Sequence, residues 1–171
     1  MRMRIIVYTA AALLIVCIAY VAQIWMEIRS VEPVYARASQ WRTDMDKRSI
    51  PAEELMSGGP GKDGIPSIDD PEFVSITQAG TWIDGAEPVI SLRIEGQSRA
   101  YPLQILNWHE IVNDRIGQVP VSITYCPLCN IGIVFDRRIT NPVLSFGVSG
   151  VLIRSDTLIY ADQTASWGQQ F

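Results

Sequence analysis

The fold is decided by one stretch of the sequence, which reads Val119-Pro120-Val121-Ser122-Ile123-Thr124-Tyr125-Cys126-Pro127-Leu128-Cys129-Asn130-Ile131-Gly132-Ile133-Val134-Phe135. Apolar residues alternate with polar or small residues from Val119 to Tyr125, and Ile131, Ile133 and Phe135 repeat the spacing of two. An alternation with a period of two predicts half-buried β-strands. The Cys-Pro-Leu-Cys segment between the two strands is therefore expected at a turn or hairpin tip.

Further strand signals extend outward from this hairpin in both directions. A strand is predicted at 88–94, with a turn at 95–97 and a returning strand at 98–101, and two more strands at 143–148 and 151–160. A short helix is predicted at 102–114, where Pro102 suits the first turn. The glycine-rich segment 57–64 fails the P-loop pattern and reads as a structural loop. The predicted fold is mainly β with short helices (α+β), built as an antiparallel meander.

The N-terminal segment differs in character from the rest of the chain. No charged residue occurs from Ile5 to Trp25, a run of about 31 Å as a helix, which matches the hydrocarbon core of a bilayer. Arg2 and Arg4 precede the run and place the amino terminus in the cytoplasm. The alternative is a signal peptide cleaved after Ala36, although the apolar run exceeds the usual signal length.

The domain organisation follows from this predicted anchor. Residues 1–4 form a cytoplasmic tail, residues 5–25 a single transmembrane helix in the lipid bilayer, and residues 26–56 a juxtamembrane stalk. Residues 57–171 are expected to form one β-rich domain outside the cytoplasm, in the periplasm or at the cell surface. The net charge is -4 and no basic run occurs, so nucleic acid is not an expected partner.

The close pair Cys126 and Cys129 is the first candidate site, with three interpretations. A redox dithiol is one, although the pair precedes a strand and not the activating helix of thioredoxin-like proteins. Half of a zinc site is the second, which His109 and a carboxylate from Glu110, Asp114 or Asp136 would complete. A structural disulfide in a non-catalytic binding or scaffold module is the third.

The second candidate region lies around the only histidine. His109 and Asn113 share a helix face in the predicted helix, as do Glu110 and Asp114. A histidine beside a carboxylate can act as a general base or a metal ligand. Arg99, just before this helix, could bind an anion, although an ion pair is the simpler interpretation.

Five ordered motifs carry a family resemblance. They are Gly-Pro-Gly-Lys-Asp-Gly-Ile-Pro (59–66), Arg-Ala-Tyr-Pro (99–102), Asn-Trp-His-Glu-Ile-Val-Asn-Asp (107–114), Thr-Tyr-Cys-Pro-Leu-Cys (124–129) and Phe-Gly-Val-Ser-Gly (146–150), with Ser155-Asp156 after them. From about Arg48 onward the chain resembles a bacterial and archaeal family catalogued as domain of unknown function 3179. The family's recurrent polar residues match Arg99, His109, Glu110, Asn113, Cys126, Cys129, Ser149 and Asp156.

The resemblance implies an exported or anchored protein without an established activity. The chain departs from the family pattern where Asn130 replaces the usual glycine after the cysteine pair, and where the pattern continues past Trp167. A domain truncated at its C-terminus, without a closing strand, is therefore expected.

The resulting function hypothesis is a thiol-redox or metal-dependent role. Its candidate catalytic residues are Cys126, Cys129 and His109, with Glu110 and Arg99 weaker. The same two cysteines and His109 are the candidate ligands of a zinc or other transition-metal ion. Both versions predict that the three side chains lie within reach of one another.

Overall fold

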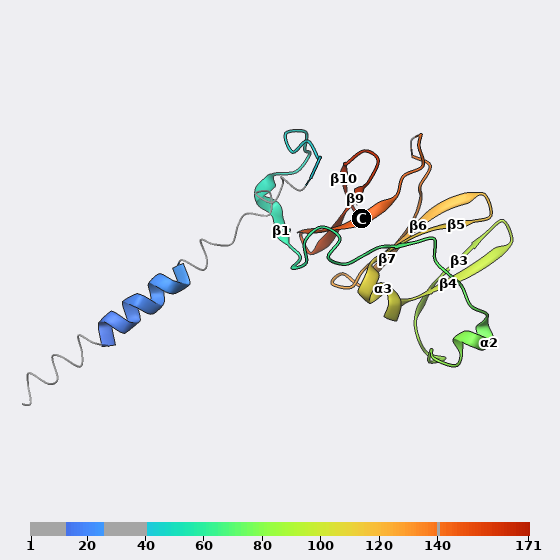
Figure 1. The fold of residues 1–171 in the computed structure, drawn as a ribbon, viewed down its shortest axis with the longest axis horizontal. Helices are drawn as coiled ribbons and strands as arrows, with labels where there is room; N and C mark the ends of the chain where they lie inside the picture. The colour runs from blue at the N-terminus through green and yellow to red at the C-terminus, as the bar shows by residue number, and fades with distance from the viewer. Residues whose placement is uncertain (1–12, 26–40, 140) are drawn as a thin grey trace, which may run out of the picture. The chain divides into compact units, whose positions relative to one another are not determined.

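The computed structural model describes residues 13–25, 41–139 and 141–171, and the chain divides into two compact units, Met1–Arg37 and Ala38–Phe171 (Figure 1). In the first unit, residues 13–25 are helical. The predicted membrane span at 5–25 lies partly outside the described residues, as does the predicted stalk at 26–56. Within the described ranges, no helix combines the length and the apolar character needed to cross a membrane.

Over residues 41–139 and 141–171, the second unit contains two four-stranded sheets and a separate hairpin. The first sheet has the order β1 (Leu55–Ser57), β8 (Phe146–Ile153), β9 (Asp156–Ala161), β10 (Trp167–Gln169), and its pairings are antiparallel. The second has the order β2 (Ile68–Asp69), β5 (Ile111–Ile116), β6 (Val119–Cys126), β7 (Ile131–Asp136), with β2 parallel to β5 and the other pairs antiparallel. The hairpin joins β3 (Val89–Ile94) to β4 (Gln97–Pro102). The prediction of a mainly β, largely antiparallel fold is confirmed at this level.

The helices in the described part of this unit are short. They are a 3₁₀ turn, η2 (Ala52–Glu54), and two α-helices, α2 (Ile76–Ala79) and α3 (Leu103–His109). Ser75 begins α2 with a reciprocal capping box, in which its hydroxyl and the Gln78 side chain each accept a backbone N–H. α3 follows β4 directly and buries Leu106 against the core.

Strand β5 lies between two hydrophobic clusters and contributes to both. Val112 and Ile116 pack in a cluster with residues of β4, α3 and β6, whereas Ile111 packs with residues of β8 and β9. Neighbouring residues of a strand point to opposite faces, so β5 is buried on both sides. This explains why Ile111 to Asp114 are buried without interruption.

Strand β6 follows the same rule and positions the cysteine pair. Val121, Ile123 and Tyr125 point into the cluster with β4 and α3. The intervening Thr124 and Cys126 therefore face the opposite way, where Gln170 Nε2 donates to Thr124 Oγ1 at 2.9 Å. Cys126 is thus placed on the face that looks toward β9 and the residues after β10.

The structure corrects three predicted elements. The helix predicted at 102–114 ends at His109, and Ile111–Ile116 is strand β5. The strands predicted at 143–148 and 151–160 are one long strand, β8, and its partner β9, with the turn at Arg154 and Ser155. The structure also has a strand that the sequence does not predict, β10, which pairs with β9 from Trp167 onward.

Candidate metal centre

The cysteine pair occupies the turn between β6 and β7, as the alternation of the sequence predicts. β6 ends at Cys126, and β7 begins at Ile131, directly opposite it in the register. Asn130 takes a left-handed conformation with φ of 53°, which asparagine tolerates, and its Oδ1 accepts a 2.9 Å hydrogen bond from Tyr125 Oη. The turn brings the two Sγ atoms to 2.9 Å, with both thiols free.

A second turn, between β8 and β9, lies against this pair. Arg154 and Ser155 form it with φ values of 48° and 70°, a two-residue connection with the positive φ angles of a type I′ turn. The Ser155 carbonyl oxygen accepts from Cys129 Sγ at 2.8 Å and from Cys126 Sγ at 3.7 Å. The two turns are therefore in direct contact through the thiols.

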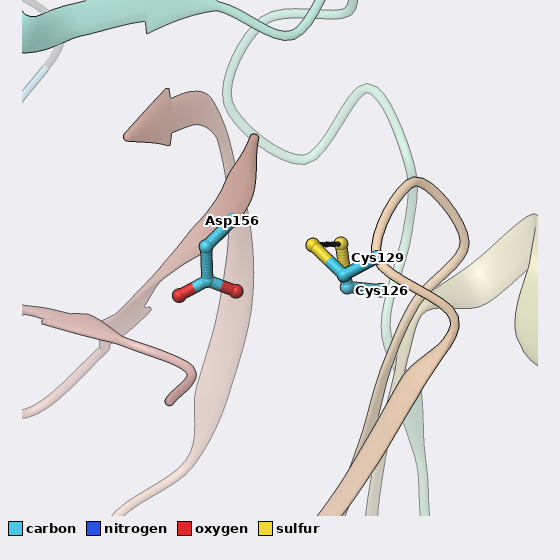
Figure 2. Close-up of side chains that lie close together, drawn as sticks. All are labelled: Cys126, Cys129 and Asp156. Carbon is cyan, nitrogen blue, oxygen red and sulfur yellow. Dashed lines mark hydrogen bonds between the residues drawn. The ribbon is translucent and has the colours of Figure 1, made fainter. Parts of the chain in front are cut away.

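Asp156 follows Ser155 and completes a cluster of ligand-type atoms. A carboxylate oxygen of Asp156 and the Sγ atoms of Cys126 and Cys129 all lie within 4.8 Å of one another (Figure 2). Asp156 is only 1% exposed and Cys126 is fully buried. One oxygen, Oδ2, accepts from the Phe171 amide at 3.3 Å, whereas Oδ1 is buried and has no hydrogen-bond partner. A buried, unpartnered carboxylate oxygen requires a compensating group.

The electrostatics of the cluster oppose negative charge. Burial raises the pKa of the Cys129 thiol to about 12, with further contributions from its hydrogen bond to Cys126 and from the charge of Asp156. Three groups that are negatively charged when ionised thus converge in a largely buried space. A bound cation would reverse this balance by attracting the same three groups.

His109 does not join this cluster. The described residues contain one group of metal-ligand side chains at such distances, and its members are the two cysteines and Asp156. His109 ends α3, and its Nδ1 lies 2.8 Å from the Pro66 carbonyl oxygen. The imidazole therefore contacts the segment before β2 and lies outside the cysteine cluster.

The other candidate residues have structural partners. Arg99 forms an ion pair with the buried Asp114, whose Oδ2 also accepts from Tyr101 Oη at 2.6 Å, so the ion-pair interpretation of Arg99 is confirmed. Its guanidinium also lies over the Phe73 ring, 4.4 Å from the centroid. Glu110 caps α3 with φ of 55°, and burial raises the pKa of its carboxyl group.

The carboxylate that meets the thiols is therefore none of the three expected ones. Asp114 is paired with Arg99, and the hydrogen bonds from Arg138 hold the pKa of Asp136 at about 2. In the sequence, only the family resemblance points to Asp156, as one of the recurrent polar residues. Asp156 directly follows the Arg154–Ser155 turn, which brings it to the thiols. The turn cannot be recognised from the sequence, because it contains no glycine.

The family DUF3179, described as "Protein of unknown function", matches residues 62–171. No curated protein and no solved structure matches the chain at a significant level. The matched region contains both cysteines of the cluster and Asp156. Since the match covers more than half of the sequence, the chain belongs to the DUF3179 family of proteins of unknown function.

Proposed function

We propose that the domain binds a divalent transition-metal ion, with Zn²⁺ as the first candidate, through Cys126, Cys129 and Asp156. The observation that carries the proposal is the convergence of two thiols and one buried carboxylate within 4.8 Å from two different hairpins. The unpartnered Oδ1 of Asp156 adds support, because a metal ion would satisfy it.

The donor set selects the kind of metal. Thiolates are soft ligands that favour zinc and other late transition metals, whereas Mg²⁺ and Ca²⁺ prefer oxygen ligands alone. Zinc is borderline in softness and also accepts a carboxylate oxygen. Two sulfurs at about 2.3 Å from a tetrahedral ion would lie about 3.8 Å apart. The present 2.9 Å separation of the sulfurs must therefore widen on binding.

A metal titration of the purified full chain tests the proposal. We expect one equivalent of Zn²⁺ or Co²⁺ to bind, with the absorption of a cobalt–thiolate bond in the Co²⁺ form. Cys126→Ser, Cys129→Ser and Asp156→Asn should each weaken binding at least tenfold. The matched controls are Cys17→Ser, in the N-terminal unit, and Asp136→Asn, an exposed carboxylate paired with Arg138. Binding that survives in Cys126→Ser would exclude this site.

A thiol-redox role is the second candidate, favoured by the 2.9 Å separation of the sulfurs. Two features disfavour it: β7 follows the pair, so no helix N-terminus stabilises a thiolate, and the pKa of Cys129 is raised. Equilibration in glutathione buffers distinguishes the two roles. A redox-active pair should interconvert with its disulfide at a potential above about −300 mV, and a metal site should keep its thiols protected from alkylation while Zn²⁺ is bound.

We also propose, from the sequence, that residues 5–25 anchor the chain in a membrane with the C-terminal domain outside the cytoplasm. The uncharged run and the preceding Arg2 and Arg4 support it. Carbonate extraction of membranes is the test. The intact chain should stay with the membrane fraction, and its release would count against the anchor.

A further inference from the structure

The Ser155 carbonyl oxygen occupies a position within the proposed metal site that the side chains alone do not reveal. It lies 2.8 Å from Cys129 Sγ and 3.7 Å from Cys126 Sγ, so both thiols point at the same backbone atom. The next residue in the chain is Asp156, which supplies the third ligand-type group. The carbonyl is thus bracketed by the three groups that would hold the ion.

Metal binding would remove the hydrogen bonds that the Ser155 carbonyl oxygen accepts from the two thiols. The thiols now donate S–H hydrogen bonds to it, but a thiol that binds a metal releases its proton to solvent. A thiolate and a carbonyl oxygen 2.8 Å apart are both electron-rich and repel each other. The contact can persist only if a cation lies between them or if the carbonyl turns away.

The hairpin leaves the carbonyl little freedom to turn away. Ile153 pairs with Asp156 across the turn, so both ends of the Arg154–Ser155 connection are fixed by the β8–β9 register. A two-residue turn of this kind has two positive φ angles and no other residue that could absorb a rotation. Asp156 is also buried, which fixes the peptide that follows Ser155.

We propose that the Ser155 carbonyl oxygen is the fourth ligand and closes the coordination sphere. This inference rests on the proposed metal-binding function and goes beyond it. Two sulfurs, one carboxylate oxygen and one carbonyl oxygen make a tetrahedral set with no position for water or substrate. Four protein ligands are typical of structural zinc sites, whereas catalytic sites keep one position open. The ion would then join the β6–β7 turn to the β8–β9 turn without catalysing a reaction.

Exogenous ligands distinguish a closed site from an open one. The full chain is loaded with Co²⁺ and titrated with azide while its visible spectrum is recorded. A closed, four-ligand site should show no spectral change at millimolar azide. Asp156→Asn, loaded at high Co²⁺, provides the positive control, because losing the carboxylate should open a position that azide fills.

A substitution in the turn gives an independent measurement. Proline fixes φ near −65°, so Ser155→Pro cannot keep the present φ of 70° and should displace the carbonyl. We expect Co²⁺ affinity to fall at least tenfold and the remaining site to bind azide. Arg154→Gly is the matched control in the same turn, because glycine readily adopts a positive φ, and its affinity should stay within about twofold.

The outcomes separate the two levels of the argument. If the wild-type chain binds no metal, the proposed function fails. If it binds one ion but the Co²⁺ spectrum responds to azide as the Asp156→Asn variant does, a water holds the fourth position and only the closed-site inference fails. The wild-type measurement decides this even if Ser155→Pro does not fold.

Discussion

The two carboxylate oxygens of Asp156 differ in their hydrogen bonding. Oδ2 accepts the Phe171 amide hydrogen, and Oδ1 has no partner. The hydrogen bond from the Phe171 amide holds the carboxylate in one orientation and leaves Oδ1 as the oxygen without a hydrogen-bond partner. Groups that orient a ligand in this way tune metal affinity without touching the ion.

Proline at position 171 would remove this amide hydrogen. We expect Phe171→Pro to weaken metal binding about tenfold, the loss typical of an outer-shell partner. Phe171→Ala keeps the N–H and is the control for the lost ring, which is exposed. Competition with a chelator measures both affinities, and melting temperatures verify that both variants fold. An equal loss in the two variants would show that the hydrogen bond has no orienting role.

The burial of Glu110 leads to a testable prediction about the pH dependence of stability. Burial raises the pKa of its carboxyl group, so the fold favours the protonated form. The pKa of Glu110 is therefore higher in the folded protein than in the unfolded chain. Its protonation stabilises the fold fully at pH values below the unfolded pKa of about 4.3. This stabilisation is lost as the pH rises through the pKa of the folded state.

Glu110→Gln should therefore stabilise the domain at pH 7 and have little effect near pH 4. Glutamine keeps the shape of the side chain but carries no charge that burial would penalise. Urea denaturation at the two pH values measures the difference. Glu72→Gln, at an exposed position, is the control. A gain of equal size at both pH values would point to a cause other than ionisation.

At the scale of single elements, the strands were predictable where polarity alternates and a turn residue bounds them. The β6 and β7 strands and the β3–β4 hairpin appear close to their expected ranges. The predicted helix 102–114 was too long because Glu110 adopts a left-handed conformation, which stops α3. The residues after it pair with β6 in a hairpin whose turn contains Gly117, and a helical pattern of polar residues does not reveal this pairing.

The segment 143–160 was divided at the wrong residues for a related reason. Ser149-Gly150 resembles a turn, but the structure has a register shift between Val148 and Val151, so Gly150 lies in a β-bulge. The true turn, Arg154-Ser155, has positive φ angles without glycine or asparagine. A single sequence gives no direct signal for such a turn, and the position of Asp156 beside the cysteines depends on it.

The bulge also explains the glycine-rich loop before β2. The Gly58 amide donates to the Gly150 carbonyl at 2.8 Å, and the Asp63 amide donates to the Val148 carbonyl at 3.0 Å. A Cβ atom at Gly150 would lie 2.0 Å from the Pro60 carbonyl oxygen. These contacts hold the loop against β8, which agrees with the prediction of a structural loop in the segment 57–64.

Gly150→Ala should consequently destabilise the domain. The added methyl group meets backbone atoms that cannot move aside, and the φ of +72° is strained for alanine, so a loss of about 2–4 kcal/mol is expected. Gly61→Ala, in the facing loop, has no atom within 4 Å of its Cβ and should change the free energy of unfolding by less than about 0.5 kcal/mol. Similar effects at both positions would refute the tight-contact argument.

At the scale of the whole domain, residues before the matched region pack onto the sheets. Trp41 contacts the rings of Tyr160 and Trp167 edge-on, with centroids 5.0 and 4.8 Å away. At the start of the matched region, Lys62 Nζ lies over the same Tyr160 ring and forms an ion pair with Asp63. The compact unit Ala38–Phe171 therefore includes Trp41 together with the matched region.

The candidate site shows the same division between local and global information. The cysteine pair and its turn were predictable, because both depend on neighbours in the sequence. Asp156 and the Ser155 carbonyl were not, because they reach the thiols only through the packing of two sheets. His109 is predicted as a ligand because it is the only histidine of the sequence and imidazole binds metals. Its suitability as a ligand does not determine where the fold places it, which is outside the cluster.

Because the proposed ion joins hairpins from two different sheets, its largest effect should be on the stability of the domain. A ligand that binds only the folded state stabilises it by about 2.7 kcal/mol at a free concentration one hundred times its Kd. Thermal or urea unfolding of the full chain, with and without Zn²⁺ at that excess, should show this increase, and a chelator should reverse it.

Cys17→Ser should retain the stabilisation by Zn²⁺. Cys126→Ser and Asp156→Asn should lose most of it at the same Zn²⁺ concentration, because they break the link from the β6–β7 side and from the β8–β9 side respectively. An equal response in Cys126→Ser would mean that zinc stabilises the protein from another site.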